Sequence, residues 1–432
     1  MNEQLLGILS VLAMFVLMFA GVPVAVAMIL PALIGILLIS GPQVLAATVD
    51  STIWNHAMSF PLATIPLFVL MGELLSESGI THRLFDTVRI WFGRLRGSLA
   101  LSTIGASAVM AAASGSSVAT TGTMGVVAGR EMHAAKYDPQ LASGAIVSGG
   151  GLGILIPPST LLLLYGTLTE ESIGQLLIAG VVPGLILTGL LMLTVIIFVI
   201  IKPSVAPGGE PHPLIDKFKS LGPISLILVI FLVVMGSMYS GWASPTESAA
   251  LGVVGALAVG LGRRSLSLRG IMTSLVKTIK TTGFIFAIVL GSFILNHLLA
   301  VSQIAGDLTR FIAGLETNTF VIFLAIVLMY LVLGAFMDSF AMVVITVPLV
   351  MPIVDALALD PIWFGIVLVV LVEIALITPP VGMNLFVLRG VSPELSMGSI
   401  MKGALVFVIP MLALVFLLYF IPDIALWLPS NM

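Results

Sequence analysis

Residues 98–129 read SLALSTIGASAVMAAASGSSVATTGTMGVVAG, a stretch without charge in which nearly half of the residues are Gly, Ser or Thr. Arg94 and Arg96 precede this stretch and Arg130 follows it. Because loops rich in Lys and Arg remain in the cytoplasm, both ends are assigned to that side of the membrane. Each half would form about 22 Å of helix, too short for a hydrocarbon core about 30 Å thick. The stretch is therefore expected to enter the membrane and turn back as a re-entrant hairpin.

The composition of the whole chain is that of a polytopic membrane protein. Of its 432 residues, 59% are hydrophobic and 9% are charged, and the mean hydropathy is +1.22. Soluble domains carry about 25% charged residues, and disordered chains combine low hydrophobicity with high charge. A soluble enzyme and a disordered chain are both excluded.

Several chemistries have no motif in this sequence. There is no cysteine, no Walker A pattern for ATP, no HExxH motif and no long basic run that could hold nucleic acid. No clustered catalytic set supports an enzyme. The N-terminal stretch is expected to be a first span and not a cleaved signal peptide, because it carries Glu3 and no basic residue.

Counting apolar segments against the basic clusters predicts about ten spanning helices and two re-entrant hairpins. The second hairpin is residues 317–354, whose ends are assigned to the outside, as are both chain termini. Residues 80–96 and 303–316 are too polar to span and are expected to be amphipathic helices at the two interfaces. The predicted fold class is an all-α polytopic membrane protein of the elevator-type ion-transporter kind.

An internal repeat supports this topology. A shift of 222 residues places Gly153–Pro158 over Ala375–Pro380, and Ser114–Ser117 over Phe336–Ser339. Both hairpins and both Pro-Pro pairs thus fall in one register, with opposite orientation in the membrane. Inverted repeats with interrupted helices are typical of secondary transporters, which bind substrate and ions where the repeats meet.

The two Pro-Pro pairs are expected to interrupt spanning helices, and Gly149–Gly153 should loosen the first break further. Backbone carbonyls left without partners can bind Na⁺, and the hairpin tips supply further oxygens. Alternatively, neighbouring Ser and Thr fill the kinks, or the small residues serve tight helix packing. The candidate sodium ligands are Ser114, Ser116, Ser117, Gly151, Gly153, Gly334, Asp338, Ser339 and Thr378.

Asp338 is the ionisable residue of the second tip. A charge at this depth needs a partner, and no Lys or Arg is predicted there. Either a bound cation or the N-terminus of the following helix must stabilise it.

The same lack of basic side chains bears on an anionic substrate, which must be held by helix N-termini, hydroxyl groups and bound cations. The candidate substrate residues are Thr120, Ser159, Thr160 and Asn384. Each could instead hydrogen bond to its own preceding turn.

Other polar residues receive structural interpretations. Ser244-Pro245-Thr246-Glu247 reads as a capping box. Glu73 and Glu77 are expected to meet water or nearby arginines, and His297 to be a satisfied polar residue. Glu373 is left open between an ionic partner, a second-layer residue and a proton carrier.

The order of these motifs resembles the large membrane subunit of tripartite ATP-independent periplasmic (TRAP) transporters over nearly the whole chain. The stretches that carry the resemblance are PLATIPLFVLMG at 61–72, SGSS at 114–117, GLGILIPPS at 151–159, SPTESAA at 244–250 and TPPVGMN at 378–384.

The resemblance implies a bacterial or archaeal inner-membrane protein that imports an organic acid, a dicarboxylate or sugar acid, with two or more Na⁺ as the coupling ions. It implies a periplasmic substrate-binding protein and a separate small four-helix membrane subunit as partners, no ATP, and an elevator motion. The tip and break residues would then be the sodium and substrate positions.

The expected division follows the repeat. Transport-domain halves are assigned to residues 98–168 and 303–390, and scaffold helices to 1–97, 169–302 and 391–432. The alternative function is a stand-alone cation-coupled carboxylate or ion transporter that needs no binding protein, followed by a channel or membrane-embedded enzyme.

Overall fold

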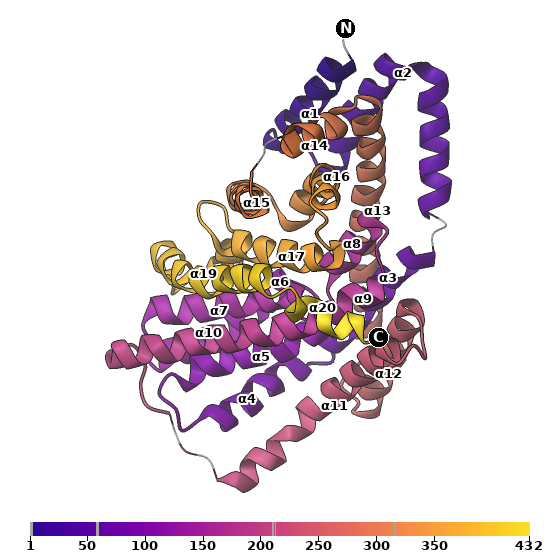
Figure 1. The fold of residues 1–432 in the computed structure, drawn as a ribbon. Helices are drawn as coiled ribbons and strands as arrows, with labels where there is room; N and C mark the ends of the chain where they lie inside the picture. Colours follow the sequence, from indigo (N-terminus) through magenta and orange to yellow (C-terminus); the bar gives the residue numbers. More distant parts are fainter. Residues whose placement is uncertain (1–2, 58–59, 210, 212, 315–316) are drawn as a thin grey trace.

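The computed structural model describes residues 3–57, 60–209, 211, 213–314 and 317–432, and every regular element in these ranges is a helix. The predicted all-α membrane fold class is confirmed. The helices stack in layers, with α5, α7, α10 and α19 running roughly side by side in the lower part of Figure 1 and α1, α2 and α14 above them. Their bounds are given below, group by group.

The N-terminal group contains one long helix with a break inside it. Its elements are α1 (Glu3–Phe19), α2 (Val24–Ala57), η1 (Phe60–Ala63), α3 (Thr64–Glu77) and α4 (Ile80–Phe92). Non-helical backbone at Gly41 (φ 83°, ψ 175°) divides α2, and the helix resumes at Pro42. The predicted amphipathic segment 80–96 does contain a helix, α4.

The first half of the repeat is a helical hairpin followed by a broken helix. It comprises α5 (Ser98–Ser114), α6 (Ser117–Ala134), α7 (Pro139–Leu155) and α8 (Thr160–Thr169). The axes of α7 and α8 differ by 41°. The break occupies residues 156–159, where Pro157 and Pro158 cannot donate to the helix ladder.

The second half has the same order and nearly the same bounds. It comprises α15 (Thr319–Gly334), α16 (Ser339–Ala356), α17 (Pro361–Ile377) and α18 (Met383–Val391). The bounds of α7 and α17 lie 222 residues apart, the shift predicted from the sequence. The N-caps also correspond, because Asp138 and Asp360 each accept hydrogen bonds from the next two free backbone N–H groups.

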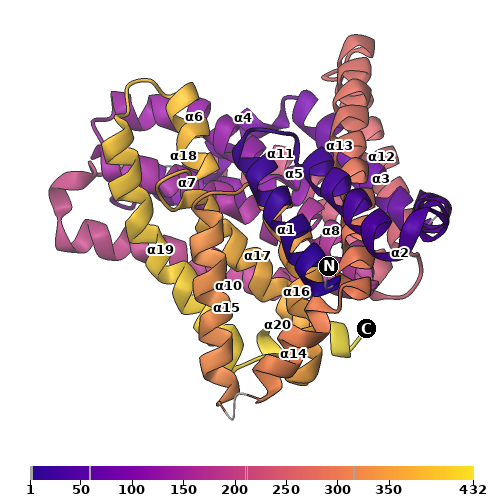
Figure 2. The ribbon, with the colours of Figure 1, turned by 90° about the horizontal axis from the view of Figure 1, so that it is seen from above.

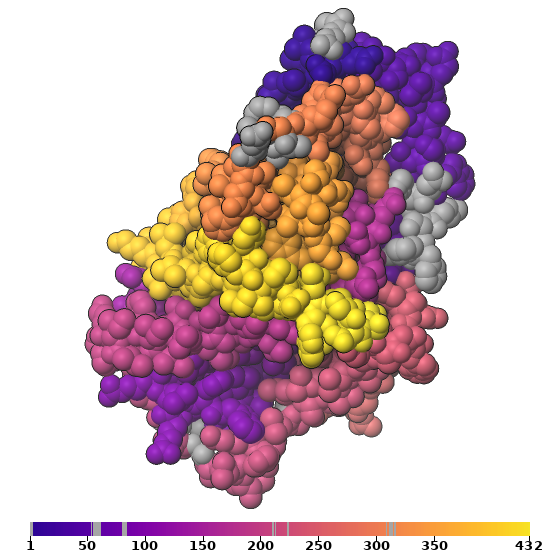
Figure 3. All heavy atoms as spheres, viewed as in Figure 1, coloured from indigo at the N-terminus to yellow at the C-terminus, as the bar shows by residue number. Residues whose placement is uncertain are grey.

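The remaining helices surround these halves. They are α9 (Ile173–Ala179), α10 (Val181–Ile201), η2 (Pro203–Val205), α11 (Leu214–Tyr239), α12 (Pro245–Gly262), α13 (Leu268–Val301), α14 (Ile304–Gly314), α19 (Met397–Phe420) and α20 (Asp423–Ser430). Helix α14 lies in the second segment predicted to be amphipathic. In Figure 3, α19 and α20 form a yellow belt on the visible face, with orange second-half segments above it and α10 directly below it.

The core lies along α7 and α17. Every residue from Leu141 to Leu155 and from Trp363 to Ile377 is buried. A helix buried on all sides needs apolar or small residues on every face, which explains the Val-, Ile- and Leu-rich sequence of α17 and the glycines of α7.

The two halves also contact each other. Helix α18 of the second half packs on α6 of the first, and α16 of the second half packs on α8 of the first; Figure 2 shows α18 beside α6. These two pairs are exchanged by the 222-residue shift, so the contact itself follows the repeat.

Six helices within the described residues are long and apolar enough to cross a membrane, or up to eight if each strongly bent pair counts as one span. The count of about ten spans, the positions of the termini and the division into scaffold and transport domains remain predictions.

Candidate functional site

The first hairpin tip turns at Gly115, between α5 and α6. Gly115 has φ +59°, a conformation that costs glycine little. Ser116 caps α6, its Oγ accepting a hydrogen bond from the Ala119 N–H at 3.3 Å. Thr120 Oγ1 donates to the Ser116 carbonyl at 2.8 Å and lies 2.9 Å from Ser114 Oγ. The tip therefore gathers several hydroxyl and carbonyl oxygens.

This tip is seated directly on the break between α7 and α8. Thr160 Oγ1 donates to the Gly115 carbonyl at 2.9 Å, and a Cβ added at Gly115 would lie 2.5 Å from the Pro158 carbonyl oxygen. A Cβ added at Gly153 would lie 2.6 Å from the Ser116 carbonyl oxygen. The structure thus brings together Ser114, Gly115, Ser116, Thr120, Gly153 and Thr160.

The break leaves backbone carbonyls without their helical donors. In an unbroken helix, the carbonyls of Gly153 and Ile154 would accept hydrogen bonds from the N–H groups of residues 157 and 158. Both of these residues are prolines, which have no N–H. Ser159 Oγ donates to the Ile154 carbonyl and accepts from the Leu162 N–H at 3.2 Å, so it caps α8. The Ser159 side chain therefore has local partners, whereas Pro157 leaves the Gly153 carbonyl without one in the helix ladder.

Gly151 is not brought to the tip. It lies inside α7, where the helix pairs its carbonyl with the Leu155 N–H, and a Cβ there would be 3.5 Å from Met411 and 3.7 Å from Glu373. The expectation that Gly149–Gly153 loosen the break is wrong, because all five residues are helical. The glycines instead allow neighbouring helices to approach closely, as at Gly150, where a Cβ would lie 1.9 Å from Thr121 Oγ1.

At the second tip, Asp338 caps α16. Its Oδ1 accepts hydrogen bonds from the N–H groups of Phe340 at 2.9 Å and Ala341 at 3.1 Å. The helix-terminus interpretation of Asp338 is therefore realised in the structure, while its interpretation as a cation ligand remains a prediction. Asp338 and Ser339 are half-buried.

The second break is more open than the first. Thr378 Oγ1 donates to the Ile374 carbonyl at 2.6 Å, and a Cβ added at Gly334 would lie 2.0 Å from Ala375 Cβ, so the end of α15 lies against the end of α17. Val381 is 42% exposed, whereas Ile156–Thr160 of the first break are buried.

One hydrogen bond joins polar candidates of the two halves. Asn384 Nδ2, in the first turn of α18, donates to Ser117 Oγ in the first turn of α6 at 2.6 Å. Both side chains are buried, and Asn384 Oδ1 has no partner among the described residues. An unpaired buried amide oxygen costs about 1–3 kcal/mol, so this atom is a natural acceptor for a ligand.

Two further buried hydroxyls, those of Ser107 and Thr121, lie outside the candidate ligand list, and the sequence left the role of Glu373 open. Ser107 Oγ, Thr121 Oγ1 and both carboxyl oxygens of Glu373 are buried without a partner within the described ranges. Glu373 had a sequence signal, because it is the one ionisable residue in the otherwise apolar α17, whereas Ser107 and Thr121 lie in helices that contain several other Ser and Thr residues. No group of three or more His, Cys, Asp or Glu side chains among the described residues could hold a metal ion.

Three structural interpretations from the sequence can be compared directly. Ser244 and Glu247 form the predicted capping box, and His297 has a partner, Thr48 Oγ1 at 3.1 Å. Glu73 and Glu77 pair with Lys277, at 3.5 and 2.8 Å, in place of a nearby arginine, while both carboxyl side chains remain partly exposed. A long α13 explains the difference, because it carries Lys277 past α3.

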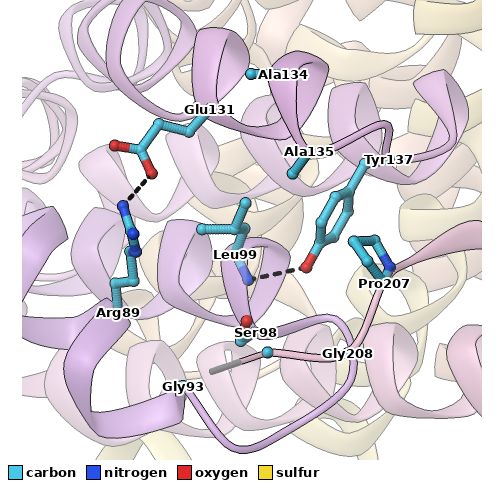
Figure 4. A pocket seen from close by; sticks show the side chains of 11 residues that line it. Arg89, Gly93, Ser98, Leu99, Glu131, Ala134, Ala135, Tyr137, Pro207 and Gly208 are labelled. Carbon is cyan, nitrogen blue, oxygen red and sulfur yellow. Dashed lines mark hydrogen bonds and ion pairs between the residues drawn. The ribbon is translucent and has the colours of Figure 1, made fainter. Parts of the chain in front are cut away.

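A cavity of about 350 Å³ lies away from both tips, at the arm helix α4. Figure 4 shows that Arg89 of α4 pairs with Glu131 of α6, at 2.5 Å, and that the Leu99 N–H donates to Tyr137 Oη at 3.2 Å. Residues 207–209 cross the opening, and a Cβ at Gly209 would lie 1.9 Å from the Gly93 carbonyl oxygen. The cavity is lined by α4, by the two helices of the first hairpin and by residues 207–209. Its two charged side chains, Arg89 and Glu131, already pair with each other.

Comparison with known proteins identifies the family. The family model for the tripartite ATP-independent periplasmic transporter, DctM component, matches residues 11–424. This chain belongs to that family. It is 34% identical to the C4-dicarboxylate TRAP transporter large permease protein DctM of Pseudomonas aeruginosa over 372 residues, 86% of each chain. It is 31% identical to the sialic acid TRAP transporter large permease protein SiaM of Vibrio cholerae over 415 residues, 96% of each chain.

The fold of this TRAP large permease subunit also occurs in a distant solved structure. The YdaH transporter of Alcanivorax borkumensis matches with a TM-score of 0.62 over 90% of this chain and 89% of its own, at 16% identity. The resemblance noted in the sequence is confirmed. The chain is a multi-pass membrane protein of a transporter family, and the relatives named here are permeases.

Proposed function

We propose that this subunit carries a small organic acid, a dicarboxylate or a sugar acid, across the inner membrane, coupled to Na⁺. A periplasmic binding protein delivers the acid, and a small four-helix membrane subunit packs beside this chain, with no use of ATP. The C4-dicarboxylate and sialic acid named for the relatives support this substrate class. The transport domain moves by an elevator-type motion, with both chain termini periplasmic.

The observation that carries the proposal is the first tip seated on the first break. Gly153, whose carbonyl has no helical donor because residue 157 is proline, packs against the Ser116 carbonyl and the Thr120 hydroxyl, and the Thr120 hydroxyl lies 2.9 Å from that of Ser114. Backbone carbonyls of unwound helices and hydroxyl oxygens are the ligands with which such transporters hold Na⁺. Ser117 extends this set towards the second half through Asn384.

The corresponding second set contains Asp338, Ser339, Gly334 and Thr378. Here the carboxylate supplies one negative charge that a cation balances, and Asp338 is only half-buried. Two matched sets predict two or more coupling ions.

The organic acid is proposed to bind between these sets. The N-terminus of α8 at Ser159 and Thr160, and Asn384 with Thr120, supply donors and acceptors where no Lys or Arg is available. Bound Na⁺ then provides the positive charge that a carboxylate needs, so anion binding requires prior cation binding.

The test is uptake into liposomes that contain this chain with its small membrane subunit. We expect uptake of a labelled C4-dicarboxylate or sialic acid only with an inward Na⁺ gradient and with the binding protein added. Equal uptake with K⁺ replacing Na⁺ would overturn sodium coupling. Robust Na⁺-dependent uptake without the binding protein would establish the stand-alone transporter instead.

A further inference from the structure

Helix α13 runs against α16, the second leg of the second hairpin (Figure 1). Phe284 of α13 meets Phe340 of α16 with ring centroids 6.0 Å apart, two residues beyond Asp338. Further along, Ser292 Oγ donates to the Val344 carbonyl at 3.4 Å. One side of α13 therefore lies along α16, the hairpin leg that begins at the proposed ion site.

The Val344 carbonyl is available because of a proline. Helix α16 contains Pro348 and Pro352, and a proline supplies no N–H to the carbonyl four residues before it. The carbonyls of Val344 and Pro348 therefore both lack their helical donors. They are one turn apart, so they lie on one face of α16.

The donors on α13 have the same spacing. Ser292 and Asn296 are one turn apart on α13, and Ser292 is the one that is used in this structure. The Asn296 side chain is exposed and has no hydrogen-bond partner among the described residues. Both residues line a cavity of about 250 Å³ that Pro348, Met351 and Pro352 border from the α16 side.

We propose that Ser292 and Asn296 are positioning residues that hold α16 in two registers, one helical turn apart, during the transport cycle. In the structure described here, the Val344 carbonyl accepts from Ser292. In the second register, α16 has moved about 5.4 Å along α13 into the cavity, and the same carbonyl accepts from Asn296. The hydrogen bond is exchanged and not lost, so neither register leaves the Val344 carbonyl without a donor.

This inference rests on the proposed function only in that uptake requires the second half to move past α13. It explains two prolines inside one apolar helix, a weak bond from a buried serine and an unused amide beside a cavity. A static α13–α16 contact would need none of these.

Cysteine cross-linking tests the two registers, and the chain has no native cysteine to interfere. One variant combines S292C with V344C, and the other N296C with V344C. Each is reconstituted with the small subunit and treated with a short bis-thiosulfonate reagent, alone, with Na⁺, and with Na⁺, binding protein and acid. Matched single-cysteine variants give the background.

We expect both pairs to cross-link, with the ratio between them changed at least fivefold by Na⁺ and substrate. Cross-linking of the 292–344 pair alone under all conditions would overturn the two-register proposal, as would a ratio that ligands leave unchanged. These outcomes are independent of uptake, so a failure here differs from a failure of sodium-coupled transport.

Two substitutions give a second readout. Asn296→Leu removes the second donor, and Pro348→Ala restores an N–H to the Val344 carbonyl. Each should slow maximal uptake about fivefold, the rate equivalent of one net hydrogen bond of about 1 kcal/mol, without changing the Na⁺ concentration at half-maximal rate. Asn296→Gln should recover most of the rate. Normal rates in both variants, with thermal stability unchanged, would contradict the positioning role.

Discussion

Asn384 and Ser117 form a buried hydrogen bond, 2.6 Å long, between residues that are 267 positions apart in the sequence. Each stands in the first turn of a helix that begins at a proposed binding feature: α6 at the first tip and α18 after the second break. The bond therefore joins the proposed ion site of one half to the helix break of the other, through side chains that are buried from water.

The first prediction concerns this bond. Ser117→Ala should lower thermal stability, because it leaves Asn384 Nδ2 buried without its acceptor, and the same substitution should cost less in an Asn384→Leu background. The coupling energy in a double-mutant cycle should be about 1 kcal/mol, the net worth of one hydrogen bond. Ser392→Ala is a matched control, because its Oγ donates to the Gly125 carbonyl in the same α6–α18 interface. The effects of Ser392→Ala and Asn384→Leu on stability should simply add. If the coupling energy between residues 384 and 392 equalled that between 384 and 117, the substitutions would be loosening the whole interface and not breaking one bond.

The second prediction separates the two roles of Asp338. Asn preserves an N-cap, whereas Ala loses about 1 kcal/mol. Asp338→Asn should therefore keep thermal stability and shift the Na⁺ dependence of uptake to higher concentration by about tenfold or more, which corresponds to about 1.4 kcal/mol of cation binding. Asp138→Asn, at an N-cap on the first half, should leave sodium dependence unchanged. An unchanged sodium titration in Asp338→Asn would reduce Asp338 to a helix cap.

The third prediction concerns Glu171, in the loop after α8. Burial raises the pKa of this carboxyl above its usual value, and the nearby Asp360 and Asp355 raise it further. A carboxyl whose folded pKa is raised favours the folded state below its unfolded pKa, and this contribution is lost as the pH rises through the folded pKa. At neutral pH the ionised Glu171 is therefore destabilising.

Glu171→Gln should raise the thermal unfolding temperature at pH 7, and this gain should disappear below about pH 4, where both states of the native residue are protonated. The neighbouring exposed residue offers a control, Glu170→Gln, which should change little at either pH. A gain in Glu171→Gln that persisted in acid would mean that packing and not charge is responsible.

The fourth prediction concerns Glu373, which is fully buried in α17 with no partner for either carboxyl oxygen among the described residues. A charge in this position would be costly, so we expect the side chain to be neutral. Glu373→Gln should leave the thermal unfolding temperature unchanged and keep the rate of Na⁺-dependent uptake within about twofold, because no charge is removed. Loss of uptake in a variant with normal thermal stability would instead show that Glu373 carries a proton or pairs with an ion during the cycle.

Much of the fold could be predicted because the decisive signals are local. The adjacent prolines at 157–158 and 379–380 each interrupt a helix, and the glycine and serine content of 114–117 marks a turn. The 222-residue shift needed only the order of such features.

The site was less predictable because its contacts join distant segments. Nothing local shows that Thr160 bonds to Gly115 or that Asn384 bonds to Ser117. Gly151 and Gly153 look equivalent in sequence, yet Pro157 removes the helical partner of the Gly153 carbonyl alone, while Gly151 faces Met411 and Glu373. The partner of Glu77 proved to be Lys277 and not a neighbouring arginine, because helix packing decided it.

Equilibrium binding of radioactive sodium to the purified complex tests the central claim most directly. We predict saturable binding that Asp338→Asn weakens and that Gly153→Val abolishes at one class of sites, with the organic acid bound only once sodium is present. Unchanged sodium binding in both variants, or tight binding of the acid in sodium-free buffer, would contradict the account.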